Sequence, residues 1–234
     1  SQIVLPKGWT WKNQEETLSS SKDQYTAVLT LEDTSNYDYT GVDGYQTNGT
    51  IIRDLNVQVS KNVNSFTSPL TISDWTYGDH TVNPSASAAY GTVRYVYSES
   101  ENGIYTDVKP QDAGTWYVKA IVDATDDYTG LESSPVSFTI NRKVMSEADI
   151  QNPSSLKGTS RDTISNVNLP NGWTWKDENT VLSTKVKEYP AIFTLTDTDV
   201  KNHDYSNLNG YVKDSVTGIE MIVRSLPVQV DKKV

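Results

Sequence analysis

The chain has 234 residues, contains no cysteine and carries a formal net charge of −10 at neutral pH. The lack of cysteine excludes disulfides and cysteine-based metal sites or nucleophiles. The acidic charge argues against nucleic acid and anionic membrane surfaces as partners. Only 35% of the residues are hydrophobic, whereas tyrosine (14) and tryptophan (6) are abundant. This balance is typical of strands with one solvated face, so we predict an all-β protein.

One segment of the sequence occurs twice. Residues 5–12 (LPKGWTWK) return as residues 169–176 (LPNGWTWK), and 15 of the 30 aligned positions from Leu5 to Thr34 are identical. The match resumes after a two-residue insertion, where Tyr39 aligns with Tyr205, and the closing run LNVQV aligns with LPVQV. A long repeat of this kind indicates a duplicated structural unit. The length changes fall in polar stretches, as expected for surface loops.

The repeat divides the chain into three predicted modules in tandem, each a small β-sandwich of Ig-like or β-grasp-like type. The boundaries are 1–62 for the first repeat, 66–141 for a different module, and 142–234 for the second repeat. Alternating patterns predict strands, which we place at 9–11, 25–31, 55–59, 93–97, 115–122 and 136–140.

The second repeat begins with an extension that the first repeat lacks. Residues 142–164 are polar and are expected to be irregular, with one helical turn near Ser146–Ile150 before Pro153. Nothing in the first repeat aligns with this stretch, so we expect the first module to be truncated at its N-terminus. We interpret the chain as a fragment of a longer protein. No apolar run approaches the roughly 18 residues of a membrane-spanning helix, and we expect no membrane span here.

The middle module contains a corner motif before its strongest strand. Asp112, Gly114, Trp116 and Val118 stand at alternate positions, in the pattern that immunoglobulin domains fill with Asp, Gly, Tyr and Cys. In those domains the tyrosine hydroxyl hydrogen-bonds back to the backbone. Trp116 takes the tyrosine place here, which leaves open whether the corner bond forms.

These motifs carry a family resemblance. The LPxGWxW block, with its downstream Tyr-x-Ala and Asp-Thr, resembles a repeat of large Gram-positive surface proteins. The middle module resembles the bacterial Ig-like repeats that accompany it, through Trp75-x-Tyr77-Gly78, Lys109-Pro110, Asp112-Ala113-Gly114 and Asp127-Tyr128-x-Gly130-Leu131. The resemblance implies an exported, cell-wall-associated adhesin of a Firmicute, and it implies no catalytic residues.

The tryptophan pairs have two interpretations. Trp9 and Trp11, like Trp173 and Trp175, share a strand face about 7 Å apart. Exposed, such a pair is a stacking platform for sugar rings; buried, it packs the core of a small module. We favour the core, because large apolar residues are usually buried. The expected framework aromatics are Trp9, Trp11, Trp75, Trp116, Trp173 and Trp175.

The loops of the two repeats are the candidate ligand-binding regions, because variable loops on a rigid scaffold carry binding. Tyrosine dominates recognition surfaces together with tryptophan. The candidate contact residues in these loops are Tyr37, Tyr39, Tyr45, His203, Tyr205 and Tyr211. His80 and His203 lie in different modules and complete no zinc site or catalytic triad.

Other motifs have ordinary explanations. Aspartates gather in loops, at 33 and 38, at 123, 126 and 127, and at 197, 199 and 204, but none has EF-hand spacing. We interpret them as turn carboxylates and expect no cofactor, with Ca²⁺ as the alternative. Asn48-Gly49-Thr50 indicates a turn rather than glycosylation. An isopeptide bond through Lys12 or Lys176 is a further hypothesis, although no motif fixes its partner.

These observations favour a binding or structural protein over an enzyme, since no pair of carboxylates or triad is singled out. We expect a non-catalytic segment of a bacterial cell-surface adhesin that acts as a stalk or spacer and includes a ligand-binding region. The alternative is a dedicated binding module for a host glycan or a host protein such as an immunoglobulin. In either case we expect an extracellular, wall-associated monomer that contacts neighbouring modules of the same protein.

Overall fold

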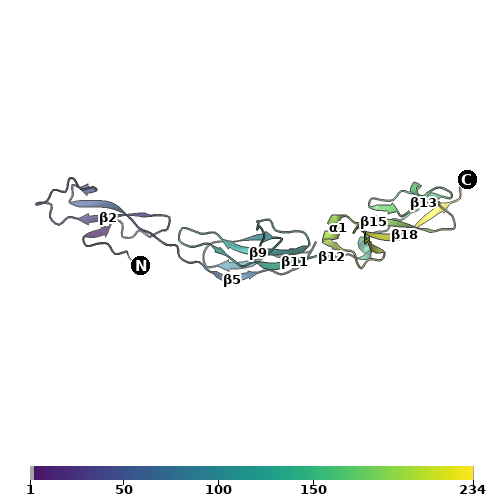
Figure 1. The fold of residues 1–234 in the computed structure, drawn as a ribbon, viewed down its shortest axis with the longest axis horizontal. Coiled ribbons are helices and arrows are strands. Elements are labelled where there is room, and N and C mark those ends of the chain that lie inside the picture. The colour runs from purple at the N-terminus through teal and green to yellow at the C-terminus, as the bar shows by residue number, and fades with distance from the viewer. Residues whose placement is uncertain (1–2, 234) are drawn as a thin grey trace. The chain divides into compact units, whose positions relative to one another are not determined.

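The computed structural model describes residues 3–233. It is mostly β, with 40% strand and one short helix, and its strands form several separate sheets (Figure 1). The all-β prediction is confirmed at this level. The chain divides into two compact units: unit 1 runs to Leu70 and adds Ser85–Tyr95 and Lys119–Ser134, and unit 2 contains Thr71–Pro84, Val96–Val118 and Pro135 onward. Every pairing between named strands lies within 1–62, 66–141 or 142–234.

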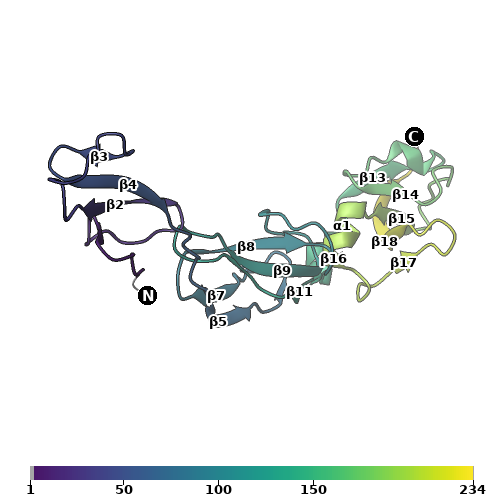
Figure 2. The same ribbon diagram turned by 60° about the vertical axis from the view of Figure 1, so that its left-hand side comes forward.

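Unit 1 contains a four-stranded antiparallel sheet in the order β1-β2-β4-β3 (Figure 2). Strands alternate their side chains between two faces, and here one face of β2 carries the buried Tyr25 and Ala27. Ala27 lies between Trp11 on β1 and Arg53 on β4. The strands are β1 (Trp9–Trp11), β2 (Gln24–Thr30), β3 (Tyr45–Gln46) and β4 (Thr50–Asn56).

Two further strand pairings complete unit 1. β5 (Phe66–Thr71) pairs with β7 (Ser85–Ala88), and β10 (Leu131–Glu132) pairs with the end of β9 (Gly114–Val122). The segment after the four-stranded sheet is hydrogen-bonded to the loop that precedes β10. Asn62 donates its N–H to the Asp127 carbonyl (2.7 Å) and accepts from the Thr129 N–H (2.9 Å).

Unit 2 begins with a sheet around β11 (Val136–Asn141). This strand is parallel to β6 (Trp75–Thr76) and antiparallel to the start of β9, while β8 (Val93–Ser98) pairs with β9. The buried Trp75 ring stacks on Phe138, with ring centroids 5.2 Å apart.

The corner motif forms in a modified way. The half-buried Trp116 donates its indole N–H to the Asp112 carbonyl over 3.0 Å, four residues upstream, as a corner tyrosine would with its hydroxyl. Val118, in the cysteine place, is fully buried. The corner bond that sequence analysis left open is thus made by an indole.

The second repeat forms a larger sheet in unit 2, in the order β13-β18-β15-β14, with β17 also on β18 (Figure 2). β13 is parallel to β18, and the other pairings are antiparallel. The strands are β13 (Leu156–Thr159), β14 (Trp173–Trp175), β15 (Glu188–Thr194), β17 (Tyr211–Lys213) and β18 (Glu220–Asp231).

The extension of the second repeat is more ordered than its composition indicates. It forms the predicted turn as a 3₁₀ helix, Glu147–Asp149, but it also contains β13, a second 3₁₀ helix (Ile164–Asn166) and β12 (Lys143–Val144), which is parallel to β16 (His203–Asp204). The prediction that this stretch is irregular was therefore wrong. The backbone of this extension is held by pairing of β13 with β18 and of β12 with β16, and such pairing cannot be recognised from a polar sequence.

The helix α1 (Asp197–Asn202) occupies part of the predicted loop, where the second repeat has two extra residues. Thr196 caps it, because its hydroxyl accepts a hydrogen bond from the Asp199 N–H (3.2 Å) while the Asp199 carboxylate accepts from Thr196 (2.6 Å). Between Ile3 and Lys233, no helix is long and apolar enough to cross a membrane.

Candidate binding groove at Trp9 and Trp11

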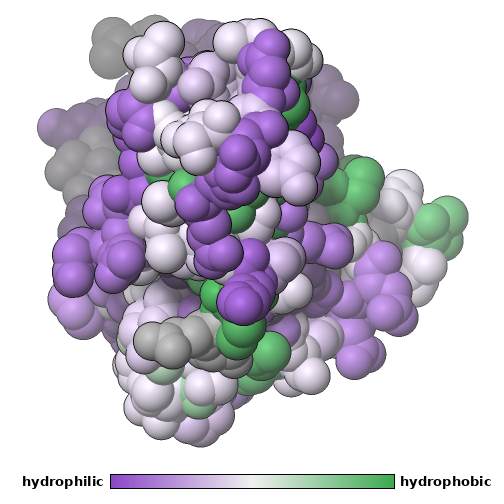
Figure 3. All heavy atoms as spheres, turned by 90° about the vertical axis from the view of Figure 1, so that its left-hand side faces the viewer, coloured by the Kyte–Doolittle hydropathy of each residue, from purple (hydrophilic) through white to green (hydrophobic). Residues whose placement is uncertain are grey.

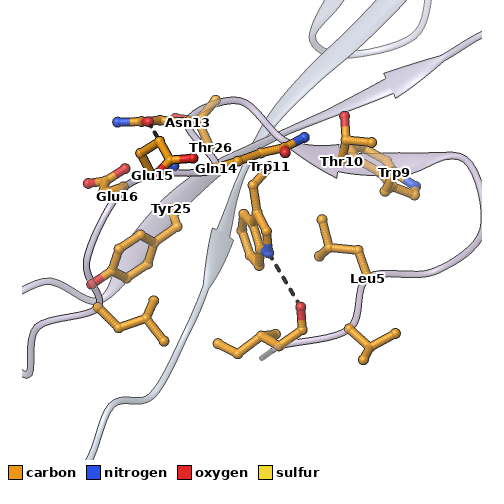
Figure 4. Close-up of a pocket in the computed structure, with 13 residues that line it drawn as sticks. Leu5, Trp9, Thr10, Trp11, Asn13, Gln14, Glu15, Glu16, Tyr25 and Thr26 are labelled. Carbon is orange, nitrogen blue, oxygen red and sulfur yellow. Dashed lines mark hydrogen bonds between the residues drawn. The ribbon is translucent and has the colours of Figure 1, made fainter. Parts of the chain in front are cut away.

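A groove of about 660 Å³ lies in unit 1 against β1 and β2 (Figure 4). The Trp11 indole stands in it between Leu5 and Tyr25. Its N–H donates to the Ile3 carbonyl over 3.4 Å, and its ring meets the Tyr25 ring edge to face at 6.4 Å. The groove is lined by Ile3, Val4, Leu5, Trp9, Thr10, Trp11, Asn13, Gln14, Glu15, Glu16, Leu18, Tyr25 and Thr26.

The same positions of the second repeat are covered. Trp173 and Trp175 are each 7% exposed, whereas Trp9 and Trp11 are only half-buried. The cover in the second repeat comes from Leu156 on β13, Ile164 and Val167, which join both tryptophans in one core. The two tryptophan pairs have the same local sequence, but the pair of the second repeat packs in a hydrophobic core, whereas the pair of the first repeat lines a groove.

One contact of the cover is present in both copies. The Trp175 indole N–H donates to the Val167 carbonyl (2.8 Å), as Trp11 does to Ile3, the residue aligned with Val167. Val167 is 4% exposed, whereas Ile3 is 38% exposed. The cover over Trp11 thus begins at Ile3 but lacks the packing that encloses Val167.

The backbone around the groove also differs between the copies. In the second repeat, β18 continues to Asp231 because β13 pairs with it from Val228 onward. In the first repeat, β4 ends at Asn56, and residues 57–59, which align with 228–230, belong to no strand. Residues 57–59, which do not line the groove, therefore lack the strand partner that their counterparts have.

One edge of the groove itself differs between the copies. In the second repeat, Ile164 donates its N–H to the Thr180 carbonyl and Leu182 donates to the Asp162 carbonyl, both over 2.8 Å. Glu16 and Leu18 are the counterparts of Thr180 and Leu182. Within residues 3–233, the backbone of these two residues makes no such hydrogen bond.

The rim of the groove is charged. Lys22 forms an ion pair with Glu16, and its ammonium lies 4.6 Å from the centroid of the Tyr25 ring. The hydrogen bond to Glu16 raises the pKa of Lys22 above its usual value. The groove thus has an apolar floor and a polar, mainly acidic rim.

The candidate loop tyrosines of unit 1 lie together. The Tyr39 ring is 6.3 Å from that of Tyr37 and stacks on that of Tyr45 at 6.4 Å. Tyr37 is 64% exposed, and Tyr39 and Tyr45 are half-buried. The rings of Tyr37 and Tyr39 in the loop and of Tyr45 on β3 therefore form a continuous ladder that reaches the surface.

Their counterparts in unit 2 are placed differently. Tyr205 is 5% exposed and packs in a core with Leu195, Leu208 and Ile222, and burial raises its pKa to about 12. His203 lies between the rings of Tyr77 (5.2 Å) and Tyr205 (6.0 Å). Tyr211 packs against the same core, and burial raises its pKa too. Residues that align between the two repeats thus form a tyrosine ladder at the surface in the first repeat and pack in or against a core in the second.

A polar cluster that sequence analysis missed joins α1 to the corner motif within unit 2. Asn202, 1% exposed, accepts from the Ala113 N–H (2.8 Å) and donates to Asp112 (3.1 Å). Lys201 forms an ion pair with the other oxygen of Asp112 (2.7 Å). The hydrogen bonds from Lys201 and then Asn202 lower the pKa of Asp112. We call these four residues the α1 joint; the length difference between the two loops was its one signal in the sequence.

The loop aspartates serve their own turns. Asp33 accepts hydrogen bonds from Asn36 and Ser35, and Asp38 accepts from Thr40. In the part of the chain that the structure describes, no three His, Cys, Asp or Glu side chains come together as a metal site. Hydrogen bonds are the leading cause of a lowered pKa at six aspartates: Asp33, Asp38, Asp112, Asp149, Asp204 and Asp214.

These shifts predict how stability depends on pH. A carboxyl group whose pKa is lowered in the folded state contributes stability above its unfolded pKa of about 3.9, and this contribution is lost as pH falls through the folded pKa. We expect the melting temperature to be level from about pH 7 to 5 and to fall below about pH 4. Thermal unfolding by circular dichroism at constant ionic strength measures this, and a melting temperature that rises below pH 4 would contradict it.

No protein-family model matches the chain, and a search of curated proteins returns no match. The resemblance to Gram-positive surface repeats therefore stays an expectation from the residues that carry it.

Proposed function

We propose that the chain is a non-catalytic segment of a bacterial cell-surface adhesin that acts as a spacer and includes a ligand-binding region. In this proposal residues 1–62, 66–141 and 142–234 are three small β-sandwich modules, of Ig-like or β-grasp-like type, in tandem. The pairings between named strands support the division, because each is confined to one of these ranges, although an isolated bridge joins Asn62 to Tyr128.

The observation that carries the proposal is that the contacts between these ranges are specific hydrogen bonds. Within unit 1, Asn62 is bonded to Asp127 and Thr129, and the Lys61 ammonium donates to the Thr125 carbonyl (2.7 Å). Within unit 2, the α1 joint links Asn202 to Asp112 and Ala113. Each of these hydrogen bonds favours one arrangement of the segments that it joins within a unit, which suits a spacer.

The surface fits an exported protein that works as a monomer. Figure 3 shows one face, on which hydrophobic residues form small patches among hydrophilic ones. Hydrophobic residues scattered over a surface in this way are normal. The net charge of −10 favours repulsion between copies. We therefore place the segment outside the cell, associated with the cell wall, with host proteins or glycans and neighbouring modules as partners and no catalytic residues or cofactor.

Small-angle X-ray scattering tests the spacer role. A compact domain of this length would have a radius of gyration of about 17 Å. Tandem modules predict a clearly larger value, unchanged over a tenfold dilution as a monomer requires. A radius near 17 Å would contradict the tandem arrangement, and a radius that grows with concentration would contradict the monomer.

The ladder of Tyr37, Tyr39 and Tyr45 supports the alternative of a dedicated binding module for a host glycan or host protein, because tyrosine is enriched where binding energy concentrates. A glycan array and a serum-protein pull-down test this alternative. It requires binding that Tyr37→Ala abolishes and that Tyr90→Ala, at an exposed tyrosine outside the ladder, leaves intact.

A further inference from the structure

We propose that Tyr90 and Tyr128 are a site of oxidative cross-linking, at which a haem peroxidase with hydrogen peroxide joins the two rings by a carbon–carbon bond that fixes their loops to each other. Tyr90 lies in the loop after β7, and Tyr128 lies in the loop between β9 and β10. Both loops belong to unit 1. This inference goes beyond the spacer role and does not depend on it, because it follows from the geometry of the two rings.

The two rings stack face to face. Their centroids are 3.6 Å apart and their planes differ by only 16°. Aromatic pairs usually keep their centroids about 4.5–7 Å apart, either offset or edge to face, so this pair overlaps almost completely. The two hydroxyls also share a hydrogen bond, which raises the pKa of Tyr128. Rings that overlap with their hydroxyls side by side place the ortho carbons of one ring over those of the other.

The backbone that carries each ring is held in place. The side chain of the buried Asn64 accepts from the Tyr90 N–H (3.2 Å) and donates to the Tyr90 carbonyl (2.8 Å). The Tyr128 N–H donates to the Thr125 hydroxyl (3.1 Å), and the Tyr128 carbonyl accepts from the Thr125 N–H (3.0 Å). Aromatic rings do not prefer complete overlap, so these anchors account for the stack. Groups held in contact in this way react as if at very high concentration.

The stack has the geometry that radical coupling requires. Hydrogen peroxide, through the haem of a peroxidase, takes one electron and one proton from each hydroxyl and is reduced to two water molecules. The two phenoxyl radicals carry unpaired spin on their ortho carbons, in orbitals that point out of the ring plane. One ortho carbon of each ring forms the new bond. Each of these carbons then loses its hydrogen as a proton, and each ring oxygen takes up a proton, which restores both phenols.

The spacing of the rings, rather than their exposure, selects this pair. Tyr90 is 48% exposed, which lets an oxidant reach the stack, but Tyr37 is more exposed at 64%. The Tyr37 ring lies 6.3 Å from that of Tyr39 and is tilted by 52° to it, and Tyr39 lies 6.4 Å from Tyr45. Oxidation governed by exposure would therefore begin at Tyr37, whereas coupling governed by geometry joins Tyr90 to Tyr128.

Oxidation of the full chain with a haem peroxidase and one equivalent of hydrogen peroxide tests the proposal. We expect dityrosine fluorescence and an intact mass lower by two hydrogen atoms, about 2 Da, since the bond is a covalent modification of fixed stoichiometry. Trypsin, which cuts after lysine and arginine, should release residues 62–94 joined to residues 120–142, in which Tyr128 is the one tyrosine. Fragment masses distinguish Tyr90 from Tyr77 in the first peptide. The rate should not depend on the chain concentration.

Phenylalanine variants give matched controls, because they keep the ring and remove the hydroxyl. Tyr90→Phe and Tyr128→Phe should each abolish the joined peptide, and Tyr37→Phe should leave its yield unchanged. In the cross-linked chain, amide exchange at Asn62 and Thr129, which are hydrogen-bonded to each other, should slow at least about tenfold, because the bond removes opened conformations in which the two loops separate.

Three results would overturn the proposal. The first is dityrosine that forms at Tyr37 or only between chains, which would show that exposure selects the site. The second is no joined peptide under conditions that couple free tyrosine. The third is an undiminished yield of the joined peptide in Tyr128→Phe, which would place the bond at another residue. Unchanged exchange at Asn62 and Thr129 in the cross-linked chain would contradict the claim that the bond fixes the loops.

Discussion

Trp175→Ala is expected to destabilise the second repeat by about 3–5 kcal/mol, the usual cost of removing a buried tryptophan. The side chain is 7% exposed and packs with Leu156, Ile164 and Leu182, and its N–H holds the Val167 carbonyl. Trp11→Ala, at the aligned position, should cost only about 1–2 kcal/mol, because Trp11 is half-buried in an open groove. An identical residue in an identical motif thus has two different energetic roles.

Hydrogen exchange followed residue by residue is the suitable measurement, because units that open separately need not share one transition. The exchange free energies of β15 amides report on Trp175→Ala, and those of β2 report on Trp11→Ala. Trp173→Ala and Trp9→Ala form a second matched pair, in which the same order is expected. Equal losses in both repeats would mean that the groove is closed in solution.

The identical motifs also show how far sequence reasoning reaches. Composition and alternation predict a β protein, and the WTW strands and the β2 and β15 strands follow from local pattern. Burial of the tryptophans does not, because their local sequence is the same in both copies. It depends on β13 and Ile164, which precede the motif and carry few apolar residues. Tertiary context, rather than propensity, decides which copy has a core there.

The aligned loops of the two repeats also differ in burial although their sequences match. Tyr39 and Tyr205 align, yet Tyr39 belongs to a surface ladder and Tyr205 to a core. The second repeat has two extra residues in this loop, and α1 forms there. The difference in burial between Tyr39 and Tyr205 accompanies this helix. Length changes in loops are usually tolerated without consequence. Here the helix that forms in the longer loop carries Lys201 and Asn202, the two residues that reach Asp112.

The α1 joint therefore predicts a large effect from a single polar substitution. Asn202→Ala should destabilise unit 2 by about 2 kcal/mol, because it leaves the Ala113 N–H without its acceptor in a buried place. Asn36→Ala is the matched control in the loop of the first repeat, where an exposed asparagine bonds only to Asp33, and it should change stability by less than about 0.5 kcal/mol.

A double-mutant cycle with Asp112→Ala separates the joint from simple loss of packing. Because Asn202 donates to Asp112, the two substitutions should be less than additive by about 0.5–1 kcal/mol. Exchange of the Ala113 amide should accelerate in Asn202→Ala, and ¹⁵N relaxation should report different tumbling for residues 96–118 and 142–233 once the bonds are lost. Full additivity together with unchanged relaxation would mean that Asn202 only fills space, and the contact between α1 and the corner motif would then contribute nothing to the rigidity that a spacer requires.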